Sequence, residues 1–300
     1  MTISITSACI VTCKFCGSNR VVKNGVRSGN IQYYLCRNCG RAFAGNNALE
    51  RMKYPPDRIA TAIRLFYDGL SIDVIRRQID SIYHVYPSDS TVYEWIARFT
   101  KVAISKAKFS NLKVGSVWIA DETVLKIDEG KDVWFWDIID DKTRFLLASH
   151  MSVTRTTKDA EALMQKAHEH TRKVPRIVYT DKLAAYLDGI ELTFGADTKH
   201  RQGSPFDVGN SNNLIERFHG TLKARTKVMR GLHNKQTAQL FMDGWLIHYK
   251  FFRPHEVLRD LPPKGQDKTP ASVAKANYPY KSWKDVVMAN AMRGETCTST

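Results

Sequence analysis

Three acidic side chains carry the chemistry that this sequence suggests. Asp121 and Asp181 each close a short apolar run, and Glu216 lies in a stretch with a helical pattern, with 34 residues between the last two acids. We predict that both aspartates end β-strands and that the glutamate lies on a helix. Carboxylates gathered in this way can hold two Mg²⁺ (or Mn²⁺) ions about 3.5 to 4 Å apart, as in enzymes that perform in-line displacement at phosphorus. The triad therefore predicts metal-dependent phosphoryl transfer.

A helix through Glu216 would bring further functional groups to the same place. Positions 216, 219 and 223 share one helix face, so Glu216, His219 and Lys223 would point toward one phosphate. A run of positive charges follows the glutamate, comprising Arg217, Lys223, Arg225, Lys227 and Arg230. We interpret this run, together with His219, as DNA-binding, with Phe218 and Leu222 on the buried side of the helix. A solvated helix face is the alternative reading.

Other carboxylates near the triad are expected to have turn or surface roles. They are Glu122, which would point to the opposite face of the strand from Asp121, and Asp137, Asp140, Asp141 and Asp188. A single aspartate at a strand end is usually a turn residue, whereas three acids in the order strand, strand, helix are harder to explain in that way.

Four cysteines have the spacing of a metal site. Cys13 and Cys16 form one C-x₂-C pair, Cys36 and Cys39 form another, and 19 residues separate the pairs. Two such pairs complete the tetrahedron of one structural Zn²⁺ ion in a zinc ribbon. Five of the six cysteines fall in the first 39 residues, which favours metal binding over disulfides in a reducing compartment. The alternative is four thiols without a metal; Cys9 and Cys297 are left over.

The charge indicates a polyanionic partner. Forty-five Lys and Arg against 30 Asp and Glu give a net charge of +15, and phosphate contacts supply the non-specific affinity of nucleic-acid proteins. An anionic membrane is the competing reading, but no apolar run approaches the roughly 20 residues of a membrane span, and the N-terminus lacks a signal-peptide pattern. We expect double-stranded DNA as the partner, no membrane association, and a cytoplasmic, nucleoid-associated location.

The elements that position these residues are expected in four parts. Residues 1–50 would form the zinc ribbon, 55–106 a module of three helices, 113–234 the catalytic domain, and 235–300 a helical tail. Helical spacing predicts the three helices over about 58–67, 71–79 and 88–99. This unit resembles a helix-turn-helix whose third helix presents Ser90, Thr91 and Tyr93 to base edges, with Thr91 and Glu94 at capping-box spacing. Any small helical bundle would look similar.

The segment with the triad has a strand pattern. Runs over 117–120, 133–139, 144–151 and 176–179 are β-branched or aromatic, and a helical stretch over 157–168 separates the last two. This order predicts a mixed α/β sheet with an antiparallel start and flanking helices.

Three segments in combination resemble the catalytic core of DDE transposases of prokaryotic insertion sequences. They are Asp121–Thr123, Tyr179–Tyr186 and Asn212–Arg225. The branch they resemble most is the insertion-sequence-six or two-forty type, over residues 55 to 260. The resemblance implies a ribonuclease H-like fold, Mg²⁺ dependence, the triad as metal ligands and Lys223 as a DNA contact. The zinc ribbon is not a fixed part of this branch, so which N-terminal module reads the DNA ends stays open.

Two tail motifs extend the resemblance. Tyr249–His255 and Lys268–Ala271 are similar to the segment after the catalytic helix in many transposases and integrases. The family implies a transposase that binds the terminal inverted repeats of its element, cleaves the DNA and transfers the strands to a target, as a homodimer or larger assembly on DNA. A catalytically decayed DNA-binding regulator, a ribonuclease H-like nuclease and a zinc-ribbon scaffold protein stay open as alternatives.

Overall fold

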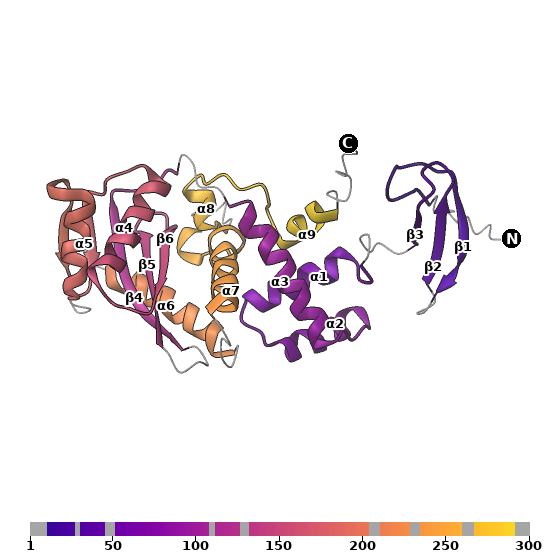
Figure 1. The fold of residues 1–300 in the computed structure, drawn as a ribbon, viewed down its shortest axis with the longest axis horizontal. Helices are drawn as coiled ribbons and strands as arrows, with labels where there is room; N and C mark the ends of the chain where they lie inside the picture. Colours follow the sequence, from indigo (N-terminus) through magenta and orange to yellow (C-terminus); the bar gives the residue numbers. More distant parts are fainter. Residues whose placement is uncertain are drawn as a thin grey trace. The chain divides into compact units, whose positions relative to one another are not determined.

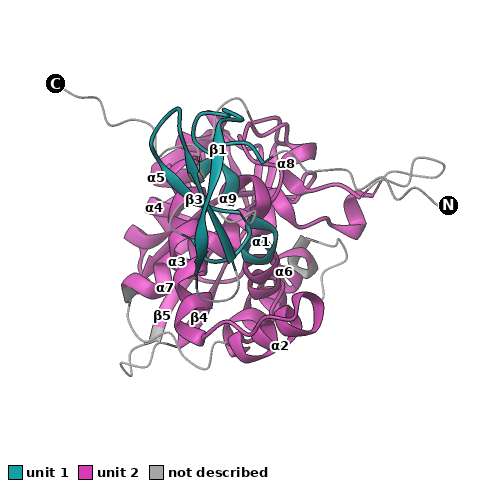
Figure 2. Ribbon diagram, turned by 90° about the vertical axis from the view of Figure 1, so that its right-hand side faces the viewer, with its two compact units in different colours: residues 1–60, 287–300 teal, residues 61–286 magenta. Residues whose placement is uncertain are grey.

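The chain forms two compact units in the computed structural model, residues 1–60 with 287–300, and residues 61–286 (Figure 2). The structure describes residues 11–27, 31–45, 52–107, 112–126, 132–203, 211–228, 235–259 and 267–291. Within these ranges, no helix combines the length and the apolar character that crossing a membrane requires.

The first unit contains a small antiparallel sheet. Strands β1 (Val21–Arg27), β2 (Ile31–Cys36) and β3 (Ala42–Ala44) lie in that order (Figure 1). Its buried core consists of Cys13, Cys36 and Phe43. A core this small supplies little hydrophobic stabilisation, so this sheet needs a crosslink of another kind.

Three helices follow, as the sequence predicts. They are α1 (Pro56–Tyr67), which spans the boundary between the units, α2 (Ile72–Tyr83) and α3 (Asp89–Ser105). The Ser71 hydroxyl accepts a hydrogen bond from the Val74 N–H and so caps α2. The predicted cap of α3 at Thr91 is wrong, because the Ser88 hydroxyl accepts from the Thr91 N–H at 3.2 Å and occupies that role three residues earlier.

A five-stranded mixed sheet forms the centre of the second unit. Its strands are β4 (Val117–Lys126), β5 (Asp132–Asp140), β6 (Leu146–Ser152), β7 (Ile177–Thr180) and β8 (Lys199–Gln202). The spatial order is β6-β5-β4-β7-β8. Strand β5 is antiparallel to both β4 and β6, whereas β7 is parallel to β4, and β8 is parallel to β7. This topology confirms the ribonuclease H-like fold. Strand β8 escaped prediction because its four residues, Lys-His-Arg-Gln, carry no apolar alternation.

Helices flank this sheet and continue into the tail. Helices α4 (Thr157–Thr171) and α5 (Ala184–Phe194) pack on each other, and α4 also packs on β5 and β6. Helix α6 (Ser211–Val228) packs on β4 and β7. Helix α7 (Lys235–Ile247) runs directly into a π-helical turn (His248–Phe252), and these two elements begin the segment that was predicted to be a helical tail. Short helices α8 (Pro270–Val273) and α9 (Trp283–Ala291) follow.

The tail completes the core around the first helices. Helix α7 packs on α3, and Gly244 leaves the space that the Tyr67 hydroxyl and the Thr100 methyl occupy. His248 lies with Nε2 3.0 Å from an Asp68 carboxylate oxygen, while the Trp283 indole N–H donates to His248 Nδ1 at 3.2 Å. Residues far apart in the sequence therefore share one hydrogen-bonded cluster.

Candidate active site

The two aspartates of the predicted triad lie at the same level of neighbouring parallel strands. Ile119 on β4 pairs with Tyr179 on β7, so Asp121 and Asp181, two residues further on, are side by side. Asp181 directly follows β7, as predicted. The predicted strand end at Asp121 is wrong, because β4 continues to Lys126 in unbroken register with β5. Asp121 therefore lies within a strand.

Glu122 belongs to the same acidic group, which contradicts its predicted surface or turn role. Carboxylate oxygens of Asp121, Glu122 and Asp181 all lie within 4.8 Å of one another. The Glu122 side chain is 2% exposed, and Arg155 Nε donates to it at 2.9 Å. Burial, and then the neighbouring Asp181 charge, raise the pKa of Glu122. The carboxylate is stable there because Arg155 supplies a counter-charge from a distant segment.

Arg155 connects the acidic group to the rest of the domain. Its Nη2 atom also bonds to Glu122 and lies 3.7 Å from an Asp181 oxygen. The guanidinium group stacks 4.6 Å from the centre of the Trp134 ring. Arg155 therefore touches two of the three acids at once.

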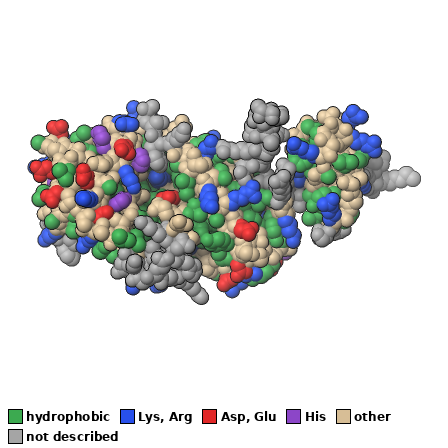
Figure 3. Space-filling model, viewed as in Figure 1, with side chains coloured by type: hydrophobic (Ala, Val, Ile, Leu, Met, Phe, Trp, Pro, Cys, Tyr) green, Lys and Arg blue, Asp and Glu red, His purple; other side chains and the backbone are tan. Residues whose placement is uncertain are grey.

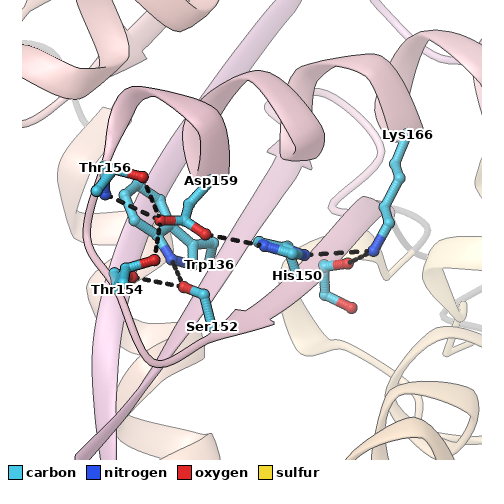
Figure 4. A network of polar contacts seen from close by, with 8 residues as sticks. Trp136, His150, Ser152, Thr154, Thr156, Asp159 and Lys166 are labelled. Carbon is cyan, nitrogen blue, oxygen red and sulfur yellow. Dashed lines mark hydrogen bonds and ion pairs between the residues drawn. The ribbon is translucent and has the colours of Figure 1, made fainter.

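The loop that carries Arg155 is fixed by the network in Figure 4. One Asp159 oxygen accepts hydrogen bonds from the Thr156 N–H at 2.9 Å and from the Thr154 and Thr156 hydroxyls at 2.8 Å. The other oxygen lies 3.3 Å from His150 Nε2 (Figure 4). Burial alone would raise the pKa of Asp159, but the hydrogen bonds from Thr156 and Thr154 lower it. The residues on both sides of Arg155 are thus held by one carboxylate.

His219 was predicted to bind DNA, but the structure shows that it holds α6 against the acids. The residue is 6% exposed, with Nε2 2.6 Å from a fully buried Asp137 oxygen and Nδ1 3.4 Å from an Asp121 oxygen. Burial alone would lower the pKa of His219, but Asp137 raises it. Burial also raises the pKa of Asp121 to about 7, where His219 acts in the opposite direction and Asp137 adds to the effect. Asp137 is therefore a buried partner of His219, not a turn residue.

The other three carboxylates for which turn or surface roles were predicted have such roles in the structure. Asp140 is buried but has a turn role, since it accepts hydrogen bonds from the Gly115 and Thr143 N–H groups at 2.8 Å. Asp188 is exposed on α5, and Asp141 lies partly exposed in the β5–β6 turn.

Glu216 is exposed and lies outside the group of three carboxylates. It precedes His219 by three residues on α6, which is about one helical turn. The structure thus brings Asp121 and Asp181 together, adds Glu122, and leaves Glu216 on the adjoining helix.

The predicted basic run divides into exposed and buried members. Arg217, Lys223 and Lys227 are exposed, whereas Arg230 lies outside the described residues. Arg225 is 3% exposed, and its guanidinium group lies 3.7 Å from the centre of the Phe66 ring. Burial lowers the pKa of Arg225 to about 10. Arg225 therefore does not belong to an exposed DNA track.

The position of Arg225 follows from helical phase. Phe218, Leu222 and Arg225 stand at i, i+4 and i+7, which places the arginine on the face that the first two bury, as predicted for Phe218 and Leu222. The prediction that Arg225 is exposed was based on the number of charges along the sequence and did not consider which helix face each charge occupies.

The residues predicted to read bases lie at the start of α3. Ser90 and Tyr93 are exposed, the latter at 42%. The Thr91 hydroxyl lies 2.8 Å from the Ser88 hydroxyl, so it already has a partner within the helix cap. The Tyr93 ring packs edge-on against Phe241.

The four cysteines of the first unit form a second candidate metal centre. The sulfurs of Cys13 and Cys39, and those of Cys16 and Cys36, are each 3.6 Å apart. A tetrahedral ion with Zn–S bonds of about 2.3 Å requires sulfur separations of about 3.8 Å. This donor set fits a zinc ion.

The two C-x₂-C turns of this centre have the same backbone conformation. The N–H groups of Gly17 and Gly40 donate to the carbonyls of Cys13 and Cys36, and both glycines have a positive φ, 68° and 69°. Glycine adopts this conformation without the steric cost that a side chain would add.

Comparison with known families identifies the central domain. Residues 115–255 match the family model of the DDE domain of the IS240 transposase type. These residues therefore form a DDE domain of the transposase type, which supports cleavage and transfer of DNA strands. None of the curated proteins matches the chain.

Several retroviral integrase structures are similar to this chain at low identity. The HTLV-2 integrase catalytic core domain, in complex with magnesium, has 15% identity over 54% of this chain and 97% of its own, with a TM-score of 0.40. The simian T-cell lymphotropic virus intasome with PP2A regulatory subunit B56 gamma has 12% identity over 75% and 77%, with a TM-score of 0.41. The BIV integrase catalytic core domain has 13% identity over 54% and 94%, with a TM-score of 0.39. The family assignment rests on the DDE domain match.

Proposed function

We propose that this transposase binds the terminal inverted repeats of its own insertion sequence and performs cleavage and strand transfer there with two Mg²⁺ (or Mn²⁺) ions. The observation that carries the proposal is the parallel register of β4 and β7, with Asp121 and Asp181 side by side. Oxygen donors of this kind suit Mg²⁺. When bound, the ions would activate the attacking oxygen and stabilise the leaving 3′ oxygen.

Glu216 is the third ligand in this proposal. The contact of His219 with Asp121 holds α6 at the acidic group, and the exposed Glu216 carboxylate lies about one turn before it. Glu122 is the competing ligand, but its carboxylate is already bonded to Arg155. Its role would be to hold Arg155 beside Asp181.

Three matched amide variants separate these roles. Asp181→Asn and Glu216→Gln should abolish Mg²⁺-dependent cleavage, because each removes a ligand charge. Glu122→Gln should retain measurable cleavage, because the amide oxygen still accepts from Arg155. If Glu122→Gln is inactive and Glu216→Gln is active, the two glutamates have been assigned the wrong way round.

The reaction is tested with purified protein, Mg²⁺ or Mn²⁺, and DNA that carries the ends of the element. Nicks that leave 3′-hydroxyl ends, joined products, and loss of both in Asp181→Ala with DNA binding retained are expected. Binding without nicking, unchanged by Asp181→Ala, would support the decayed regulator. Cleavage that ignores the end sequence and yields no joined product would support the nuclease.

The first unit is proposed to bind one structural Zn²⁺ ion through its four cysteines and to contact DNA. Between residues 11 and 45 the sequence contains six basic and no acidic residues, and only basic charges are visible on this sheet in Figure 3. Arg27 lies over the Tyr33 ring and Arg41 over the Phe15 ring, which presents cations on a rigid surface. Ser90 and Tyr93 on α3 are a second proposed contact with the ends.

Two broader expectations belong to the same proposal. Two DNA ends must be handled together, so a homodimer or larger assembly on DNA is expected, and size measurement with and without end DNA would reveal it. A protein that acts on chromosomal DNA would also be found at the nucleoid of the cell.

A further inference from the structure

A polar cavity lies beside α6, and the acidic group does not line it. Its volume is 550 Å³. One wall is the α6 face formed by Leu214, Arg217, Phe218 and Thr221, which follows the spacing i, i+3, i+4, i+7. His219, which contacts the acids, points from an adjacent face of the same helix. The cavity and the acidic group therefore lie on either side of one helix.

The opposite wall of the cavity is formed by the tail motif Tyr249–His255, which has no role in the acidic group. Arg253, Pro254 and His255 line the cavity. His255 pairs with Lys268 in an antiparallel bridge, with its N–H donating to the Lys268 carbonyl at 2.9 Å. The Arg253 N–H donates to the His248 carbonyl at 2.8 Å. These bonds fix the backbone on both sides of Pro254.

A third segment adds another cation. Arg144 lies in the β5–β6 turn with a positive φ of 59°, and its N–H donates to the Asp140 carbonyl at 3.0 Å. Its Nη1 atom is buried without a hydrogen bond and lies 3.6 Å from an Asp141 oxygen. The side chain therefore keeps donor capacity that Asp141 does not use.

The charge of the lining is strongly positive. Arg144, Arg217 and Arg253 come from three separate segments, and Glu256 is the acid among the described lining residues. Neither Arg217 nor Arg253 forms an ion pair with another described residue. Burial first, and then Arg253 and Arg144, lower the pKa of His255 to about 4. His255 is neutral at pH 7, and the three arginines converge on one space.

We propose that this cavity, the arginine pocket, binds a backbone phosphate of the DNA strand that runs along α6. The inference rests on the proposed function, since it assumes that DNA approaches this helix. Guanidinium groups match phosphate oxygens in charge and in paired hydrogen-bond geometry. Arg217 and Lys223 are exposed on α6, so a strand that reaches the acidic group passes along the helix that forms the pocket wall.

The pocket is tested by the salt dependence of DNA binding. Arg144→Gln/Arg253→Gln removes two cations, and each lost phosphate contact lowers the slope of log K against log salt by about 0.9. Loss of this one phosphate contact should lower the slope by about 0.9, so the affinity gap between variant and wild type should shrink about threefold from 50 to 200 mM KCl. Arg172→Gln/Arg176→Gln, which changes two exposed arginines directly after α4 and directly before β7, is the matched control and should keep the wild-type slope.

Two further experiments test whether a loss of binding comes from misfolding, and whether the bound phosphate belongs to DNA or is free phosphate. Arg144→Lys/Arg253→Lys keeps both charges and should restore most of the slope. The proposal is overturned if the glutamine double variant keeps the wild-type slope. It is also overturned if calorimetry shows that this variant loses binding of inorganic phosphate but keeps its affinity for DNA. Binding is measured without added Mg²⁺, and cleavage is measured separately with Mg²⁺. A wild type that binds DNA but does not cleave it with Mg²⁺ would refute the proposed function and leave the pocket standing.

Discussion

The buried pair of His219 and Asp137 should be a main support of the catalytic domain. Asp137 is fully buried, and its second oxygen already lacks a hydrogen bond. His219→Leu removes the partner of the first oxygen, 2.6 Å away. Breaking a buried ion pair on one side costs about 3 to 5 kcal/mol, because a charge is left without compensation. For a unit of this size, each kcal/mol lowers Tm by about 2 to 4 °C, so a loss of about 6 to 20 °C is expected.

A double-mutant cycle separates the charge from simple loss of packing. His219→Leu/Asp137→Val replaces both partners with apolar groups, and it should be more stable than His219→Leu alone by about 2 kcal/mol. Unfolding is measured in guanidinium chloride by the fluorescence of the buried Trp136 and Trp245. Lys223→Ala, an exposed change on the same helix, should stay within about 0.5 kcal/mol of wild type.

Two outcomes would refute this reasoning. A cost below about 1 kcal/mol for His219→Leu would show that Asp137 is not left as an uncompensated charge. A double variant less stable than the single one would show that the pair is held by packing alone.

Three further predictions concern other parts of the chain. Cys36→Ser should reduce zinc from one ion per chain and remove hydrogen-exchange protection from residues 11–45 only; unchanged metal content would contradict the zinc assignment. Gly244→Ala should cost about 1 to 3 kcal/mol in thermal unfolding because the new methyl meets the Tyr67 hydroxyl, whereas Gly220→Ala, where nothing lies within 4 Å, should be neutral or stabilising. Asp159→Asn should cost about 1 to 2 kcal/mol at pH 7. The folded-state pKa of Asp159 is lowered, so this difference is present above the unfolded-state pKa and disappears as the pH falls through the folded value; equal differences at pH 7 and pH 2 would argue against it.

Local patterns were sufficient for much of the fold and for part of the site. The cysteine spacing predicted two turns that the structure places face to face, and the apolar run before Asp181 predicted β7. Apolar periodicity predicted α1 to α4 and the first three strands of the large sheet. These features depend on residues close in sequence, where period and turn chemistry act directly.

Contacts between distant segments could not be predicted in the same way. Glu122 was assigned a turn or surface role because its partner Arg155 lies 33 residues later, and no residue near Glu122 in the sequence indicates this contact. The distance from His219 to its partner Asp137 is 82 residues. Arg225 is different, since its helical phase relative to Leu222 was readable and would have indicated burial.

The cluster that joins Asp68 to His248, 180 residues away, also sets an order of events during synthesis. At about 5 to 20 residues per second, roughly 10 to 35 s pass between the appearance of these two residues. During that interval Tyr67 lacks the partners that α7 and Trp283 later provide. A polypeptide that stops short of α7 therefore presents an unfinished apolar surface. Truncated products of this gene should be removed by proteolysis before they can compete with the intact protein for DNA.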